Sequence, residues 1–148
     1  MSKMVQALLS GMLITFILDF FLFLGIFQNY IRTQDIDLYY NILFADNQNI
    51  FIFLIFSAAL GYITLYQSKK ISITIIGILS FLSLATLITP IGYSVGKMIL
   101  MKSDVSINMQ RFSYRGDIVY DGREIIVFYD YKFKKILNLE KNKIVGEY

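Results

Sequence analysis

Few residue types in this chain could carry out chemistry. It contains no Cys and no His, which excludes a thiolate nucleophile, a disulfide framework, a Cys/His zinc site and a Ser-His-Asp arrangement. Only carboxylates, Lys, Arg, Tyr, Ser and Thr remain for acid–base work. We therefore expect a protein that is not an enzyme, with no catalytic residue, no bound cofactor and no metal site.

One carboxylate has an unusual setting. Asp19 interrupts an apolar run that extends over residues 5–27. An Asp at the centre of a membrane helix costs about 2.5–3.5 kcal/mol, whereas each Leu, Ile, Phe or Val returns about 0.3–0.6 kcal/mol. The run contains fifteen such residues, so we expect it to insert into a bilayer despite its carboxyl group.

Asp19 has three possible roles if the run spans a membrane. It can be protonated and hydrogen-bonded to Ser57, Ser83 or a backbone carbonyl, since these two serines fall at about the same depth on the next two apolar segments. It can also face a Lys or Arg of a partner protein, or take part in ion or proton transfer. The sequence leaves all three roles open.

Small residues indicate where helices pack closely. Gly11 lies two helical turns before Asp19 on the same face, and Gly61 lies one turn after Ser57. Gly92 and Gly96 form a further Gly-xxx-Gly pair. A row of small or polar residues also recurs every three positions, so it winds around its helix and predicts contacts on several sides. Its members are Thr74, Gly77, Ser80, Ser83, Thr86 and Thr89.

These residues require membrane helices to position them. A bilayer core of about 30 Å takes about 20 apolar residues in a helix, and we expect spans at about residues 5–27, 49–66 and 71–91, with a polar loop at 28–48. Pro90, the only proline, predicts a kink or helix end between residues 86 and 90. We assign residues 1–101 to this transmembrane domain.

Residues 102–148 have a different pattern, typical of a small soluble β domain. β-branched and aromatic runs alternate with turn signals at residues 115–117, 121–122 and 140–142. The predicted fold class is therefore membrane α plus small β, with three transmembrane helices followed by an antiparallel meander of four to five short strands. The predicted strands are residues 105–114, 117–120, 123–130, 133–139 and 143–147.

Composition bounds the partners. Hydrophobic residues make up 56% of the chain and the mean hydropathy is +0.57, as expected for an integral membrane protein. The net charge of +3 includes no Lys/Arg cluster dense enough to follow a nucleic-acid backbone, so we expect no nucleic acid. A sheet this small needs covering, which favours membrane lipid and other membrane subunits, in a hetero- or homo-oligomer, as partners.

The positive-inside rule gives a topology. Lys3 and the pair Lys69 and Lys70 fall on one side, which places the N-terminus in the cytoplasm. Three spans then place the C-terminal domain on the extracytoplasmic side of a bacterial inner (cytoplasmic) membrane. Cations after the third span favour the opposite side, so this alternative stays open. These cations are Lys97, Lys102, Arg111 and Arg115.

The expected function follows from these features. We expect a non-catalytic integral membrane subunit, or an accessory or assembly factor, of a larger membrane protein complex. One alternative is a small transport or ion-conducting component that uses Asp19. The other is a membrane-anchored sensor with an extracytoplasmic β domain.

Overall fold

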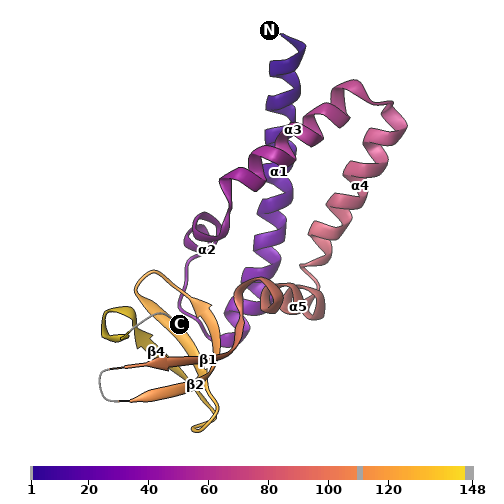
Figure 1. Cartoon of the computed structure of the whole chain (residues 1–148). Helices are drawn as coiled ribbons and strands as arrows, with labels where there is room; N and C mark the ends of the chain where they lie inside the picture. The colour runs from indigo at the N-terminus through magenta and orange to yellow at the C-terminus, as the bar shows by residue number, and fades with distance from the viewer. Residues whose placement is uncertain (1, 110–111, 146–148) are drawn as a thin grey trace. The chain divides into compact units, whose positions relative to one another are not determined.

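The fold consists of helices followed by a small sheet. The structure, a computed structural model, describes residues 2–109 and 112–145; Arg111 and Glu147 therefore lie outside the described residues. Within them, five α-helices precede a four-stranded antiparallel sheet (Figure 1), which confirms the predicted combination of helices and small β structure. The chain forms two compact units, Met1–Val95 and Gly96–Tyr148. This division falls inside the last helix, earlier than residue 101.

The first helix, α1, covers Lys3–Ile26 and begins at Ser2, whose side chain accepts a hydrogen bond from the Val5 amide. A π-helical segment, Phe27–Ile31, and a 3₁₀ turn, Arg32–Gln34, continue it. This continuous run of 32 residues has a mean hydropathy of 2.3 and is the one described helix that is long and apolar enough by itself to cross a membrane.

The second apolar segment is bent. Helix α2 covers Tyr40–Asn47 and helix α3 covers Ile50–Tyr66, and the two meet at 82°. Asn49 begins α3 because its side-chain oxygen accepts hydrogen bonds from two amides of the first turn. Much of the predicted polar loop at 28–48 is therefore helical.

The third apolar segment is also bent. Helix α4 covers Lys69–Ala85 and helix α5 covers Thr89–Leu100, at 92° to each other. The predicted break near Pro90 is confirmed, and Pro90 lies in the first turn of α5, where no backbone donor is needed. Helices α3 and α4 have 17 residues each, or about 25 Å, which is at the short end of the range for helices that cross a bilayer core.

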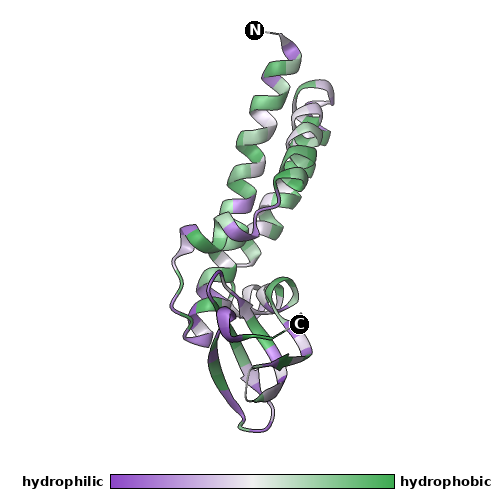
Figure 2. Cartoon of the chain, turned by 60° about the vertical axis from the view of Figure 1, so that its left-hand side comes forward, coloured by the Kyte–Doolittle hydropathy of each residue, from purple (hydrophilic) through white to green (hydrophobic). Residues whose placement is uncertain are grey.

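The surface of the helical unit is apolar. Figure 2 shows hydrophobic residues along most of the length of its helices. The side chains of Leu13, Ile55 and Phe81 are 62–72% exposed, although they are among the most hydrophobic types. Buried residues are confined to the surfaces where helices meet, which is typical of helices that lie in lipid.

The second unit contains the sheet, which consists of β1 (Lys102–Asn108), β2 (Ser113–Asp121), β3 (Ile125–Asp130) and β4 (Lys135–Glu140), paired in sequence order. Each neighbouring pair is antiparallel. One face carries a hydrophobic core of alternate side chains whose exposure is at most 5%. The core residues are Ile107, Ile118, Ile126, Phe128 and Leu139.

The four strands agree with the predicted four to five, but two features of the predicted meander are wrong. Residues 105–114 are not one strand, because the chain reverses between Asn108 and Ser113, which pair across β1 and β2. Residues 115–117 are not a turn but the interior of β2. The fifth strand is absent from the described part of its range, where Ile144 makes only an isolated bridge with Met109. Residues 146–147 of that range lie outside the description.

Candidate functional site

Asp19 is held by a residue that the sequence analysis did not identify. The Gln48 side-chain nitrogen donates a 2.9 Å hydrogen bond to a carboxylate oxygen of Asp19. Gln48 lies at the bend between α2 and α3, so the bend itself brings this amide to the middle of α1. No periodicity signals the contact, because it depends on a change of chain direction.

Aromatic side chains fix α2 against α1 and so position Gln48. Phe44 meets the rings of Phe16 and Phe23 edge-on, at centroid distances of 5.8 and 5.5 Å. Tyr40 contacts the ring of Phe20 at 5.4 Å and donates a 3.0 Å hydrogen bond to the Phe20 carbonyl. Such edge-on pairs add about 0.5–1.5 kcal/mol each beyond burial.

The three side chains predicted to meet inside the membrane do not converge. Ser83 reaches α1 at the expected depth but donates a 2.5 Å hydrogen bond to the Leu18 carbonyl and not to Asp19. Ser57 lies opposite Gly11, about 12 Å farther along α1 at 1.5 Å per residue. The depth of Ser83 therefore agrees with the sequence analysis, whereas its partner does not.

The surface between α1 and α3 is built from small residues. A Cβ atom added at Gly11 would lie 1.8 Å from the Ser57 carbonyl oxygen, and one added at Gly61 would lie 2.1 Å from the Ala7 carbonyl oxygen. Real Cβ contacts below 3.0 Å essentially do not occur. We call this antiparallel contact the α1–α3 seam, and it needs glycine at both positions.

Two hydroxyls are buried in the same region. Thr15 is one turn beyond Gly11, and its oxygen and that of Ser57 have no hydrogen-bond partner among the described residues. Their residues are 3% and 0% exposed. Unpaired buried hydroxyls destabilise the fold, and here they accompany the close approach of the α1 and α3 backbones.

Thr86 joins three helices. Its side chain donates a 2.6 Å hydrogen bond to the Ser83 carbonyl, and its own carbonyl accepts a 2.9 Å hydrogen bond from the buried Asn29 amide. A Cβ atom at Gly25 or Gly92 would lie 2.1 Å from the Thr86 hydroxyl or carbonyl oxygen, respectively. Gly92 is thus a close-packing residue of the helical unit, and Gly25 is one that the sequence analysis missed. Gly96, which belongs to the second unit, is buried.

Helix α4 contacts the rest of the helical unit at its ends. At its beginning, the Ser72 hydroxyl donates a 2.6 Å hydrogen bond to the Ile63 carbonyl of α3, and at its other end Ser83 and Thr86 contact α1. Between these points, a Cβ atom at Gly77 would meet nothing within 4 Å. Within the described residues, the hydrogen bonds of α4 to neighbouring helices are therefore made at its two ends.

We call the exposed side of α4 at Thr74, Gly77 and Phe81 the open α4 face. The three residues are spaced as i, i+3 and i+7, so they share one side of the helix. All three are exposed, and Phe81 is 72% exposed. Gly77 lacks a side chain between a hydroxyl and a large ring, and small or hydroxyl-bearing residues are the types at which membrane helices meet. We call the position of the missing side chain the recess.

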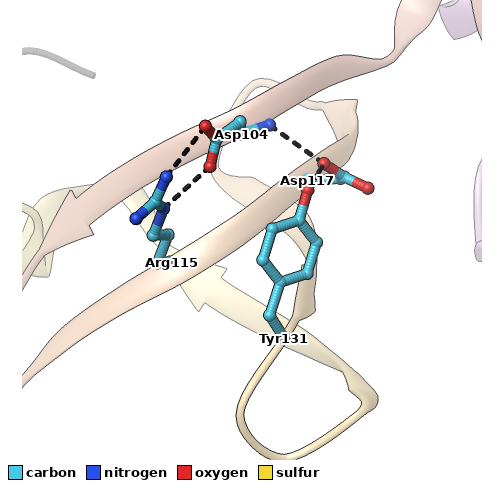
Figure 3. Close-up of polar contacts among 4 residues, drawn as sticks. All are labelled: Asp104, Arg115, Asp117 and Tyr131. Atoms are coloured by element: carbon cyan, nitrogen blue, oxygen red, sulfur yellow. Dashed lines mark hydrogen bonds and ion pairs between the residues drawn. The ribbon is translucent and has the colours of Figure 1, made fainter.

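The sheet carries a polar cluster on its surface. Figure 3 shows Arg115 donating two hydrogen bonds, of 2.8 and 3.0 Å, to the Asp104 carboxylate. Asp117 accepts from both the Asp104 amide, at 3.0 Å, and the Tyr131 hydroxyl. These contacts connect β1, β2 and the turn after β3.

The cluster changes the acidity of its members. Hydrogen bonds from Arg115, followed by its positive charge, hold the pKa of Asp104 below its ordinary value. The hydrogen bond to Asp117 raises the pKa of Tyr131. Both shifts keep each group in the protonation state that makes its contact near neutral pH, which fits a structural role.

A neighbouring group involves Asp121. Partial burial raises its pKa, but hydrogen bonds and charge from Lys141 and Lys102 outweigh this effect, so the pKa of Asp121 lies below its ordinary value. The two ion pairs measure 2.6 and 3.2 Å. They link the two ends of the sheet sequence, since Lys102 begins β1 and Lys141 follows β4.

The described side chains form no group of three or more His, Cys, Asp or Glu that could hold a metal ion. The arrangement therefore offers close helix contact, one satisfied carboxylate and an open helix face, together with a polar sheet surface. Comparisons with protein-family models, curated proteins and solved structures find no match to this chain.

Proposed function

We propose that this protein is a three-span integral membrane protein that acts as a non-catalytic subunit or accessory factor of a larger membrane assembly. The observation that carries the proposal is the open α4 face. A membrane helix with a recess at a glycine and an exposed hydroxyl gains little from lipid alone, whereas a second helix can approach it closely and accept the hydrogen bond.

The membrane part of the proposal rests on the helical unit. Its charges balance, with four Lys or Arg and four Asp in residues 1–95, and its outer surface is apolar. The two bent pairs of helices supply the second and third crossings, with the bends at the boundary of the lipid, where polar residues gather. In this arrangement α1 and α3 run antiparallel, as their seam requires.

Charge supports the predicted orientation. Because Gly11 faces Ser57 and Ala7 faces Gly61, the end of α1 that carries Lys3 lies beside the turn that carries Lys69 and Lys70. The positive-inside rule then favours the cytoplasm for this end. The second unit follows the opposite end of α4, on the extracytoplasmic side of a bacterial inner membrane.

The partner that fits the open α4 face is a transmembrane helix with a small or hydroxyl-bearing surface of its own. It belongs either to another subunit or to a second copy of this chain. The Asp19 carboxylate is already bonded to Gln48, so the proposal requires no partner cation at that position.

The test is a substitution that fills the recess. Gly77→Leu places its Cβ in open space, because nothing lies within 4 Å of the added Cβ, and leucine favours the helix more than glycine does. The variant should fold, yet it should no longer co-purify with its partner after mild detergent extraction from native membranes. Native gels and mass spectrometry of the purified material measure this loss.

Ala58→Leu is the matched control, since it places the same side chain at an exposed position of α3. It should leave the assembly intact. A wild-type protein that purifies as a stable monomer with no co-purifying protein would refute the proposal, and so would a Gly77→Leu variant that retains the partner.

The orientation has its own test, because the chain contains no Cys. A membrane-impermeant thiol reagent added to intact cells should label Asn142→Cys in the second unit but not Gln67→Cys in the α3–α4 turn. Labelling of Gln67→Cys alone would indicate the opposite orientation.

A further inference from the structure

The turn between β3 and β4 is held in one conformation without a glycine. Asp130, which is 1% exposed, accepts hydrogen bonds of 2.7 Å from the amides of both Lys132 and Phe133. Lys134 completes the reversal with a φ of 52°. A buried aspartate that fixes the backbone in this way presents the side chains of the turn in a constant arrangement.

These side chains combine aromatic rings with cations. Phe133 is 56% exposed and Tyr131 is 43% exposed. The ammonium groups of Lys132 and Lys135 each lie 5.7 Å from the centre of the Phe133 ring. An apolar ring is thus presented to solvent with two positive charges close to it.

The lysines of the turn differ from other cations of the sheet in their ion pairing. Lys102, Arg115, Lys141 and Lys143 are paired with carboxylates of the sheet. None of the ion pairs found among residues 102–109 and 112–145 involves the turn cations, which are Lys132, Lys134 and Lys135. Three charges within four residues therefore remain available to a partner.

The charge of the whole chain is concentrated in this unit. Residues 96–148 contain ten Lys or Arg against seven Asp or Glu, whereas residues 1–95 are neutral. The net charge of +3 therefore lies entirely in residues 96–148, and the three turn lysines are among its cations without carboxylate partners in the described residues.

We infer that the β3–β4 turn, residues 131–134 together with Lys135, docks on the surface of an anionic phospholipid bilayer. Aromatic rings prefer the headgroup level of a bilayer, and lysines near an anionic surface are attracted to its phosphates. A tight turn with one exposed ring flanked by ammonium groups matches both preferences. Three lysines are too few to follow a nucleic-acid backbone.

Covalent attachment strengthens this contact. The inference rests on the membrane embedding in the proposed function, though not on the partner subunit. Since the sheet follows membrane helices in the same chain, its local concentration at the bilayer surface is high, and a contact that would be weak in solution is occupied.

The experiment uses the full chain with a built-in reporter. The protein has no Trp, so Phe133→Trp introduces the only one while keeping an aromatic ring at the turn. The variant is reconstituted in phosphatidylcholine vesicles with and without phosphatidylglycerol, including lipids brominated in the upper acyl chain as quenchers. Ile125→Trp is the matched control, because Ile125 is exposed at the opposite end of the β3–β4 hairpin.

We expect Phe133→Trp fluorescence to shift to the blue and to be quenched in vesicles that contain phosphatidylglycerol, with Ile125→Trp unaffected. Replacing one turn lysine by Gln should lower the docking equilibrium about fivefold, and replacing all three should lower it roughly a hundredfold. High salt should have the same effect as the substitutions.

The possible failures are separable. Protein that does not float with the vesicles would refute the membrane embedding on which the inference rests. Floating protein whose Phe133→Trp signal equals that of Ile125→Trp, or does not respond to phosphatidylglycerol and to the Lys→Gln changes, would refute docking of the turn alone.

Discussion

Replacing Gly11 by Ala tests the α1–α3 seam directly. The added methyl group would lie 1.8 Å from the Ser57 carbonyl oxygen, 2.7 Å from the Gly61 nitrogen and 2.8 Å from the Ser57 carbonyl carbon. All three are backbone atoms, which cannot rotate away as a side chain can. The two helices must therefore separate until the shortest distance increases from 1.8 Å to at least 3.0 Å.

The expected cost follows from two opposing terms. Forcing a group into a packed surface costs about 1–3 kcal/mol, and backbone contact places Gly11→Ala at the upper end. Alanine returns about 1 kcal/mol because it favours the helix more than glycine does. We expect a net loss of about 2 kcal/mol in the free energy of unfolding, or about thirtyfold in the folding equilibrium.

Gly77→Ala provides the internal control. It makes the same chemical change on α4, where nothing lies within 4 Å of the new methyl group, so only the helix preference remains and the variant should be more stable by up to about 1 kcal/mol. Titration of the micellar protein with sodium dodecyl sulfate, followed by circular dichroism, measures both values. If Gly11→Ala and Gly77→Ala changed the free energy of unfolding in the same direction, the close contact at the α1–α3 seam would be refuted.

Three further predictions concern polar groups. Asp130→Ala should destabilise the sheet by about 1–3 kcal/mol, because it leaves two turn amides without their acceptor; amide hydrogen exchange of the β3–β4 hairpin measures this. The pKa of Asp121 is lowered from 3.8, so its contribution to stability is present above that value and is lost as the pH falls through the lower folded value. Asp121→Asn should flatten the acid limb of a pH titration followed by circular dichroism. Asp19→Asn keeps an acceptor for Gln48 and should change stability by less than about 1 kcal/mol; a changed ion flux through reconstituted vesicles would instead favour transport.

The strands of the sheet were predictable in number but not in all of their bounds. The Asp121–Gly122 reversal between β2 and β3 is real, because this dipeptide favours a turn. Gly116 lies inside β2 for another reason: a Cβ atom there would lie 1.9 Å from the Tyr129 carbonyl oxygen of β3. A glycine needed for close strand approach looks the same in sequence as a turn glycine.

The predicted strands also break after Asp130, at residues 131–132, but the observed turn is longer and β4 begins only at Lys135. No glycine or proline indicates it, since a side-chain acceptor and a Lys in the left-handed region shape it instead. The contact of Gln48 with Asp19 was not predicted, because the change of chain direction between α2 and α3 has no sequence signal either. The bend near Pro90 was predictable because proline acts on its own backbone, whereas the bend between α2 and α3 contains neither proline nor glycine.

Position along a helix was more predictable than direction around it. Ser83 meets α1 at Leu18, next to Asp19, as residue counting suggests. Residue counting does not fix which way each side chain points. The Ser83 hydroxyl therefore bonds the Leu18 carbonyl and not the Asp19 carboxylate. Thr86 and Gly25 meet for the same reason, through a contact that depends on the rotation of two helices.

The two points at which α4 is attached have a consequence for biogenesis. Ser72 holds one end to α3, and Ser83 and Thr86 hold the other to α1, so these hydrogen bonds at both ends of α4 are made within one polypeptide. Synthesis and insertion of the chain can therefore be completed before any assembly takes place. If the proposed function holds, closed chains can accumulate before they meet a partner, and the supply of that partner, rather than the folding of this protein, sets the pace at which the complex forms.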